Sequence, residues 1–332
     1  MKKVLVVNVN WLGDNILSLP IFKALKEKFY VAVMIPSRVK DLYKNNYVDE
    51  IIVFDERNEN KSLLSKLKFI RSLRSKKFDI AFFLHRSFTK VFICFLAGIK
   101  ERVGYSRFKN FFILTKKIKP KDPLSIHRQD YYFYLFESYG IHIKDRDPFI
   151  YIDENIKENI KRSIDKKYSY LIGINLGSNW ELKSWPKENF VKLIDLLIEN
   201  LNCVILFTGL EKDLETAIYI INSVKDKSRI YNFCGKTDLT KLIATLSLLD
   251  LFVSADSGPA HLATALKRKT IVLFGPTSEK LTAPRSGCVY IIRKELNCKI
   301  PCYDLSCKDN LCMKKITPED VFSKVLEVLK NG

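Results

Sequence analysis

The residues best suited to chemistry lie in three polar segments, each of which directly follows a predicted strand. The segments are Asn10–Asn15, Gly177–Pro186 and Ser254–Ala265. A helix is predicted after each segment, and the first N–H groups of a helix have no acceptor within the helix. These groups favour anions, so the pattern predicts that phosphates or carboxylates bind at these positions.

The first segment reads Asn-Trp-Leu-Gly-Asp-Asn, and its chemical interest lies in one carboxylate. Gly13 allows a ligand to approach the backbone closely. Asp14 has two interpretations: it is a helix N-cap, a position that aspartate often fills, or a general base at the carboxyl edge of a sheet. Taken alone, the segment favours the N-cap.

The second segment brings a hydroxyl, an amide and an ammonium group onto one loop. These groups belong to Ser178, Asn179 and Lys183, and together they suit a diphosphate. The structural alternative is that Trp185–Glu188 does no more than start a helix, because proline is common at the first helical position.

The third segment, Ser254–Ala265, carries the strongest signal. A strand ends here in small residues, and a helix with an early proline follows. Ser257 and Gly258 place N–H groups at the positive end of that helix, and His261 lies about one turn later. A lone helical histidine is more often structural, but the polar surroundings favour a binding role. The strand Thr270–Phe274 delivers a similar turn, Gly-Pro-Thr, to the same edge.

The common nucleotide-binding fingerprints are missing from the sequence. No GxGxxG motif occurs, and Gly235–Thr237 resembles the end of a phosphate loop but has Ile230 where the earlier glycine is required. The sequence therefore supports neither a Rossmann-type dehydrogenase nor a P-loop ATPase.

Short apolar, β-branched runs alternate with amphipathic segments along the whole chain. Such alternation predicts parallel sheets covered by helices on both faces. The sequence thus predicts an α/β fold with two doubly wound, Rossmann-like domains that face a central cleft, where the carboxyl ends of the strands bind ligands. The predicted strands are Val4–Val9, Tyr30–Ile35, Glu50–Phe54, Phe78–Leu84, Tyr170–Leu176, Cys203–Thr208, Arg229–Phe233, Leu251–Ser254, Thr270–Phe274 and Val289–Ile292. The predicted helices include Leu17–Phe29, Ser62–Lys76, Tyr131–Tyr139 and Thr317–Lys330.

The alternation is interrupted by the polar segment Asp145–Asp165, in which Phe149–Ile152 is an isolated predicted strand. We place the domain boundary there. The expected divisions are a first domain at residues 1–160, a second domain at 161–316, and a C-terminal helix at 317–332 that packs back toward the first domain.

The net charge of +19 is concentrated in the first half of the chain. Residues 1–150 hold 29 Lys and Arg against 15 Asp and Glu, which gives +14, and residues 151–332 hold 27 against 22, which gives +5. A lysine-rich genome explains the total but not this split. The asymmetry predicts a polyanionic partner: nucleic acid, anionic lipid headgroups or a phosphorylated glycan. Zinc fingers and aromatic RNA platforms are absent, which disfavours nucleic acid.

No apolar run approaches the roughly 20 residues that span a bilayer. The N-terminal run Val4–Val7 is short, is followed by polar residues and lacks a cleavage site, so it predicts a first strand and not a signal peptide. We expect a cytoplasmic protein that touches a membrane at most peripherally.

Four of the eight cysteines cluster near the C-terminus, at Cys298, Cys302, Cys307 and Cys312. The cluster has the ligands for a zinc ion or an iron–sulfur centre but lacks the CxxC pairs of zinc ribbons. Free thiols or local disulfides are favoured over a metal, and disulfides are uncommon in the cytosol.

The motifs together resemble glycosyltransferase family 9, the lipopolysaccharide heptosyltransferases. The resemblance spans nearly the whole chain and keeps the order of the motifs. In addition to the three polar segments, it rests on Ser18–Pro20, on Leu96–Ile99 with Arg102–Tyr105, on Phe274–Thr277 and on the cysteine-rich tail.

The resemblance implies a GT-B fold, an ADP-L-glycero-D-manno-heptose donor, inversion at the anomeric carbon and no required metal. Asp14 would be the catalytic base, Lys183 would stabilise the departing ADP, and Gly13 and Asn15 would serve the acceptor or domain closure. The implied donor-binding residues are Ser178, Asn179, Asp213 (or Glu211), Thr237, Asp256, Ser257, Gly258 and His261.

The implied acceptor is Kdo-lipid A or a heptosylated lipopolysaccharide core, at the inner face of the cytoplasmic membrane. The first domain would bind it, and the basic charge would face its carboxylates and phosphates. Trp180–Leu182 is less rich in glycine and alanine than is common in the family. Another nucleotide sugar or core acceptor therefore stays open as an alternative. A catalytically silent sugar-nucleotide binder and a basic nucleic-acid-binding protein are the alternatives from other classes.

Overall fold

Six parallel strands form the sheet of the first domain, in the order β3-β2-β1-β4-β5-β6. Runs such as Val-Leu-Val-Val in β1 are fully buried, as expected for strands covered on both faces. The strands are β1 (Lys3–Val7), β2 (Tyr30–Ile35), β3 (Glu50–Val53), β4 (Ile80–Phe83), β5 (Glu101–Tyr105) and β6 (Lys116–Ile118). The helices are α1 (Leu12–Lys26), the 3₁₀ helix η1 (Ser37–Tyr43), α2 (Leu63–Ser75), α3 (Phe88–Leu96) and α4 (Arg128–Glu137).

A second sheet of six parallel strands has the order β12-β11-β10-β7-β8-β9. Its strands are β7 (Tyr170–Asn175), β8 (Cys203–Thr208), β9 (Ile230–Asn232), β10 (Leu251–Ala255), β11 (Lys269–Phe274) and β12 (Val289–Arg293). The α-helices are α5 (Glu154–Ser163), α6 (Lys187–Asn200), α7 (Leu214–Ser223), α8 (Leu239–Ser247), α9 (Gly258–Ala265), α10 (Glu279–Thr282), α11 (Leu311–Lys314) and α12 (Pro318–Lys330), and the 3₁₀ helices are η3 (Glu181–Lys183) and η4 (Glu211–Asp213).

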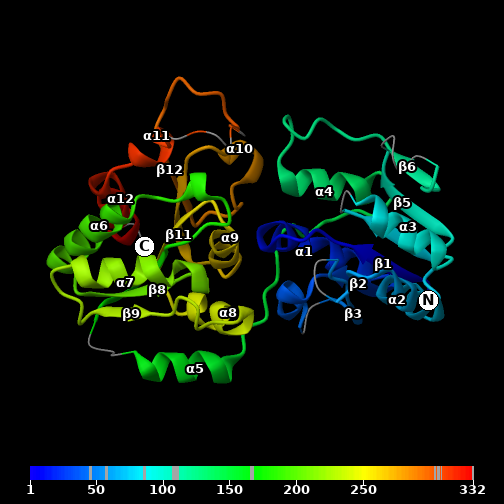
Figure 1. Cartoon of the computed structure of the whole chain (residues 1–332), viewed down its shortest axis with the longest axis horizontal. Coiled ribbons are helices and arrows are strands. Elements are labelled where there is room, and N and C mark those ends of the chain that lie inside the picture. The colour runs from blue at the N-terminus through cyan, green and yellow to red at the C-terminus, as the bar shows by residue number, and fades with distance from the viewer. Residues whose placement is uncertain are drawn as a thin grey trace. The chain divides into compact units, whose positions relative to one another are not determined.

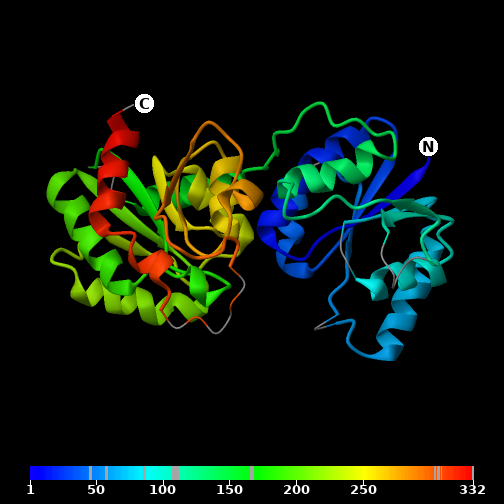
Figure 2. The same ribbon diagram turned by 90° about the horizontal axis from the view of Figure 1, so that it is seen from above.

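This computed structural model describes residues 1–330 except 45–46, 57–58, 85–86, 107–111, 165–167, 303, 305–306 and 308. The chain divides into two compact units, Met1–Tyr151 and Ile152–Gly332, which we call the first and second domains (Figure 1). In each domain helices cover both faces of the sheet (Figure 2): α1 and α4 pack together on one face of the first sheet, and α2 and α3 pack together on the other. The predicted doubly wound α/β fold is confirmed.

Three details differ from the sequence-based expectation. The segment Phe149–Ile152 forms no strand, because it lies in the connection between the domains, where no sheet edge pairs with it. The first helix begins at Leu12 and not at Leu17, so that Asp14 lies inside its first turn. The domain division falls after Tyr151, earlier than the expected residue 160, because α5 packs against α8 of the second domain.

The C-terminal helix α12 belongs to the second domain. Val321, Val325 and Val328 lie on its apolar face, and all three are fully buried in the core that also contains Leu193 of α6 and Ile271 of β11. Burial of three valines there is a favourable apolar contact, and it accounts for the packing against α6 and β11 in place of the expected return to the first domain.

Within the described part of the chain, no helix combines the length and the apolar character needed to cross a bilayer.

Candidate functional site

In each sheet the strand order reverses next to a central strand. The reversal lies between β1 and β4 in the first sheet and between β7 and β10 in the second. The loops that follow two such strands run in opposite directions, and ligands of doubly wound sheets bind in the crevice between them. The predicted site residues follow three of these strands, β1, β7 and β10, with the exceptions of Asp213 after β8 and Thr237 after β9.

A buried ion pair connects the two loops at the reversal point of the second sheet. Lys183, at the end of η3 in the loop after β7, places its Nζ 2.7 Å from Oδ2 of Asp256, which follows β10. The same Nζ donates to the Asp256 carbonyl oxygen at 3.2 Å. The Asp256 side chain is 6% exposed and that of Lys183 is 19% exposed. A carboxylate this buried requires a partner, so the pair fixes the ammonium group at this edge.

The turn after β11 gives Asp256 a second partner. Thr277 Oγ1 donates to Oδ2 of Asp256 at 2.8 Å, and Thr282 Oγ1 lies 3.5 Å from the same oxygen. Arg293, at the end of β12, stabilises this turn by donating to the carbonyl oxygens of Gly275 at 3.1 Å and Thr277 at 3.0 Å. Residues at the ends of β7, β10, β11 and β12 therefore act together. They position the Asp256 carboxylate, which in turn positions the Lys183 ammonium.

The N-terminus of α9 lies directly after Asp256. Ser257 is its N-cap: the Oγ accepts from the Ala260 N–H at 3.4 Å and lies 2.8 Å from Ser254 Oγ. His261 is 6% exposed within the first turns of the helix. The segment predicted to bind phosphate thus combines a capped helix N-terminus with a fixed ammonium, two groups that favour anions.

The remaining predicted donor residues lie at the same edge without a direct contact to this ion pair. The Oγ of Ser178 accepts from the Trp180 N–H at 3.2 Å, and Asn179 is exposed. Thr237, after β9, is half-buried.

Asp213 has a structural task in addition to its predicted contact with the donor. Its Oδ2 accepts from the Leu210 N–H at 2.8 Å, and a Cβ at Gly177 would lie 2.0 Å from the same oxygen. Glycine is therefore required at residue 177 to leave room for this carboxylate.

In the first domain, Asp14 is not an N-cap. The N-cap of α1 is Trp11, which makes no side-chain capping bond, and Asp14 stands three residues further on. Its Oδ1 accepts from Tyr132 Oη at 2.6 Å and lies 4.0 Å from Arg128 Nε, both from α4. Among the described residues, no hydrogen bond reaches Oδ2, and the side chain is 25% exposed. One oxygen is therefore held by the protein, and the other is available to a substrate hydroxyl.

A buried polar network holds the segment that leads from β1 into α1, whose first turn carries Asp14. Asn15 Nδ2 donates to the carbonyl oxygens of Val9 and Trp11, and its Oδ1 accepts from Tyr43 Oη at 2.8 Å. Asn8 Nδ2 donates to the same Tyr43 oxygen at 2.7 Å. Asn15 and Gly13, which we predicted to serve the acceptor or domain closure, are both buried, and Asn15 fixes this segment through its hydrogen bonds.

Lys90 is a second fixed ammonium that the sequence analysis missed. It lies on α3 after β4, is 2% exposed, and its Nζ donates to Asn10 Oδ1, after β1, at 3.0 Å. This contact spans the reversal point of the first sheet, as the pair of Lys183 and Asp256 does in the second. Burial lowers the pKa of Lys90 to about 8, against the opposing effect of Glu56. The available signal was a lone lysine within the apolar run 88–96.

Two of the C-terminal cysteines, Cys302 and Cys312, lie beside the turn after β11. Cys302 N–H donates to the Pro276 carbonyl at 2.7 Å, and a Cβ at Gly275 would lie 3.2 Å from Cys312 Sγ. Burial raises the pKa of Cys312. Across the described residues, no three His, Cys, Asp or Glu side chains are grouped so as to hold a metal, and all four cysteines are free thiols.

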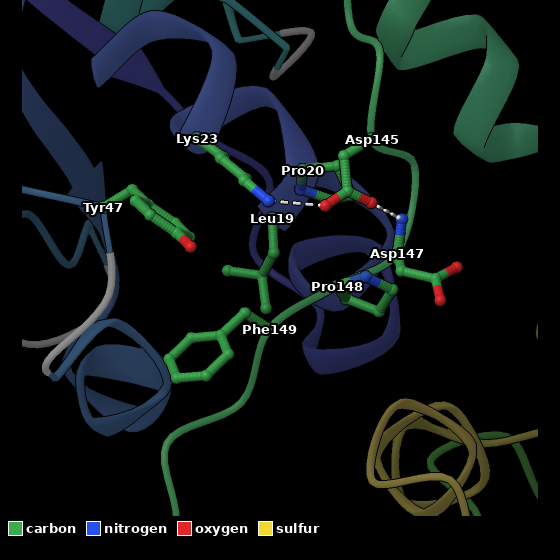
Figure 3. Close-up of a pocket in the computed structure, with 8 residues that line it drawn as sticks. All are labelled: Leu19, Pro20, Lys23, Tyr47, Asp145, Asp147, Pro148 and Phe149. Atoms are coloured by element: carbon green, nitrogen blue, oxygen red, sulfur yellow. Dashed lines mark hydrogen bonds and ion pairs between the residues drawn. The ribbon is translucent and has the colours of Figure 1, made fainter. Parts of the chain in front are cut away.

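A cavity of about 190 Å³ lies elsewhere in the first domain (Figure 3). Leu19, Pro20 and Lys23 of α1 line it together with the connecting segment 145–149, and Lys23 pairs with Asp145 across it at 2.6 Å. None of its lining residues was predicted to belong to the site. The cavity adjoins the second half of α1, whereas Asp14 lies in the first turn.

Comparisons with known proteins agree with this geometry. The chain is 29% identical to lipooligosaccharide heptosyltransferase 2 of Campylobacter jejuni (strain NCTC 11168), over 99% of both chains. It is 27% identical to lipopolysaccharide heptosyltransferase 2 of Escherichia coli K12, over 88% of both.

Solved structures share the fold. The structure of E. coli ADP-heptose LPS heptosyltransferase II matches with a TM-score of 0.83 at 24% identity, over 99% of both chains. A family 9 glycosyl transferase from Veillonella parvula matches with a TM-score of 0.88 at 22% identity, over 100% of this chain and 98% of the other. The expected GT-B fold is thereby confirmed. The family model described as glycosyltransferase family 9 (heptosyltransferase) matches residues 66–311, well over half of the sequence. The chain therefore belongs to glycosyltransferase family 9.

Proposed function

We propose that this enzyme is an inverting heptosyltransferase that moves L-glycero-D-manno-heptose from ADP-heptose to the inner core of lipopolysaccharide, in the manner of heptosyltransferase II. The observation that carries the proposal is the presence of complementary groups at the two reversal points. One domain holds a carboxylate with an available oxygen, and the other holds an ammonium beside a helix N-terminus. The names of the relatives supply the sugar and the acceptor class.

Asp14 acts as the general base in this proposal. The acceptor hydroxyl donates its proton to Oδ2 as its oxygen attacks the anomeric carbon from the face opposite ADP, which inverts the configuration. Tyr132 holds Oδ1 at 2.6 Å and so fixes the direction of the carboxylate.

Lys183 and the N-terminus of α9 stabilise the charge that develops on the β-phosphate as ADP departs. Because Asp256 is itself anionic, we assign it to positioning Lys183 and not to direct phosphate contact. The phosphates and the heptose are bound by Ser257, Gly258 and His261, with Ser178 and Asn179 from the facing loop. Asp213 and Thr237 lie further along the edge and bind the ribose and the adenine. This arrangement supplies cationic stabilisation from the chain itself, which supports transfer without a metal.

The first domain binds the acceptor, a Kdo-lipid A or heptosylated core whose carboxylates and phosphates face its basic residues. Three cations lie near Asp14 or the short segment before its helix. Arg38 Nη2 donates to the Asn10 carbonyl at 2.7 Å, Lys90 Nζ donates to Asn10 Oδ1, and Arg128 lies beside Asp14. Since the acceptor is anchored in lipid, we further propose that the enzyme works in the cytoplasm, at the inner face of the cytoplasmic membrane. No described feature favours nucleic acid as the polyanion.

The donor and the acceptor are tested together by a panel of nucleotide sugars. With EDTA present, ADP-heptose and a Kdo-bearing lipid A acceptor, with or without a first heptose, should yield ADP and a heptosylated product detected by mass spectrometry. ADP-glucose and UDP-sugars should react at least about 100-fold more slowly. Efficient transfer from another nucleotide sugar would replace heptose in the proposal, and donor binding without transfer would indicate a silent binding protein.

Removing the base should slow turnover with little effect on donor binding. Asp14→Asn keeps the size of the side chain but cannot accept the proton, so kcat should fall by roughly 10²- to 10⁴-fold. Tyr132→Phe should cost much less, because it removes the support of the base and not the base. Asp147→Asn, a change to an exposed acid of the same domain, is the control. Near-normal turnover of Asp14→Asn would exclude Asp14 as the base.

Releasing Lys183 from its partner should also slow the reaction. Asp256→Asn leaves the ammonium without its counter-charge, and kcat should fall roughly 10- to 100-fold through misplacement of the group. Thr277→Val removes a 2.8 Å bond to Asp256 and should have a larger effect than Thr282→Val, which removes a 3.5 Å contact. Steady-state kinetics with circular dichroism as a folding check measure this. Equal effects of the two threonine variants would contradict the positioning role.

Acceptor binding should weaken as pH rises through about 8, the pKa to which burial lowers Lys90. Above that pH the amine is neutral and no longer attracts an anionic acceptor. We expect the KM for a delipidated acceptor to rise several-fold between pH 7 and pH 9, and Lys90→Met to have the higher KM already at pH 7. The donor KM should not change, and Lys40→Met, at an exposed lysine of η1, should retain the wild-type profile. A wild-type pH profile in Lys90→Met would remove Lys90 from acceptor binding.

A further inference from the structure

Two neighbouring helices of the first domain expose an unusual number of large apolar side chains. Leu63, Leu64 and Leu67 lie on α2, and their exposed fractions are 74%, 72% and 46%. On α3, three phenylalanines are exposed by 39–47%, at the i, i+4 and i+7 spacing that places them on one helical face. They are Phe88, Phe92 and Phe95. We call these six residues the α2–α3 apolar surface.

The two helices form one continuous face of the domain. They pack against each other on the same side of the sheet (Figures 1 and 2). Near their C-terminal ends Arg74 donates to the Leu96 carbonyl at 2.6 Å. The rings of Phe88, Phe92 and Phe95 stack in sequence, with centroids 5.8 and 6.2 Å apart. Their buried residues, such as Ile70 and Val91, contribute to the core, so the exposed apolar residues are in excess of what packing requires.

The α2–α3 apolar surface is embedded in positive charge. Residues 61–100 contain ten Lys and Arg and a single acid, Asp79, which gives +9 of the +19 of the whole chain. Lys68, Arg71 and Arg74 are exposed on α2 itself, and Lys61 is exposed just before its N-cap. A patch of aliphatic and aromatic side chains within a basic field matches an anionic lipid bilayer, which accepts apolar side chains beneath negative headgroups. Burial against another protein would instead leave many lysines in need of acidic partners.

The position of the surface in the fold agrees with a lipid partner. α2 and α3 follow β3 and β4, so both helices begin at the carboxyl edge of the sheet. α1 also begins at this edge, and its first turn carries Asp14. Leu63, Leu64 and Phe88 therefore lie at the same edge as the proposed base.

We propose that the α2–α3 apolar surface binds an anionic bilayer by inserting its leucines and phenylalanines among the headgroups while the surrounding Lys and Arg contact the phosphates. The inference rests on the proposed function only for its purpose, which is to hold the edge of the acceptor domain near a lipid-anchored substrate. Vesicle binding itself is a property of the chain with no substrate present.

The direct test is sedimentation of the full chain with vesicles of phosphatidylethanolamine and phosphatidylglycerol, compared with vesicles of phosphatidylcholine. Wild type should bind the anionic vesicles far more tightly. Leu64→Ser/Phe92→Ser should weaken that binding by at least about tenfold. Lys68→Glu and Arg71→Glu should each weaken it by roughly fivefold or more. Ile218→Ser, at a residue of α7 that is 50% exposed, is the matched control and should bind like wild type.

Two further readouts separate the possible failures. Turnover with a delipidated acceptor should be unchanged in Leu64→Ser/Phe92→Ser, which shows that the variant is folded, and turnover with a vesicle-embedded acceptor should fall. If heptose transfer fails in every variant and in wild type but vesicle binding follows the pattern above, the proposed function is wrong and this inference stands. Wild-type vesicle binding by the double variant, or equal binding to phosphatidylcholine, would overturn it. So would a wild-type dimer that the double substitution dissociates, because the surface would then join two copies of the chain.

Discussion

The second domain depends on the contact between the Lys183 ammonium and the Asp256 carboxylate. A charge buried to this degree is costly unless it is paired, and here the cost is offset by Lys183 and Thr277. The pair joins loops that leave the sheet in opposite directions, after β7 and after β10. Arg293 and the cysteine-bearing segment then hold the turn that carries Thr277. Of the thiols in that segment, Cys312 lies beside the turn at Gly275.

In the first domain, neutral polar groups hold the corresponding loops together. Amide and hydroxyl contacts among Asn8, Asn15 and Tyr43 hold the segment after β1. Across the reversal point, Lys90 is buried against Asn10, and no carboxylate of the described residues lies within ion-pair distance of it. In the second domain the Asp256 carboxylate balances the charge of Lys183. In the first domain Lys90 is charged at neutral pH, and its hydrogen-bond partner Asn10 is a neutral amide. This contrast fits a domain that awaits an anionic acceptor, and it agrees with the excess of positive charge in the first half of the chain.

The fold could be predicted from the sequence because continuous apolar strands, such as Val31–Ile35 and Cys203–Thr208, occur mainly in parallel sheets that are buried on both faces. Sequence reasoning also singled out Asp256 and Lys183, which the structure brings into contact because they follow strand ends that meet at one edge. Contacts between residues that are far apart in the sequence could not be predicted in this way. Tyr132 reaches Asp14 from α4, 118 residues later, and its helix is aromatic throughout, so nothing local distinguishes it. The N-cap interpretation of Asp14 failed because the helix starts earlier than its apolar periodicity indicates.

The most direct test of the central claim, that Lys183 is held where the diphosphate binds, is calorimetric titration of wild type and Lys183→Met with ADP and with adenosine. The account predicts that wild type binds ADP much more tightly than adenosine, without added metal. The substitution should reduce ADP affinity by at least about tenfold, the loss expected for one charged hydrogen bond, and leave adenosine affinity unchanged. Unchanged ADP affinity, or an equal loss for both ligands, would contradict the account.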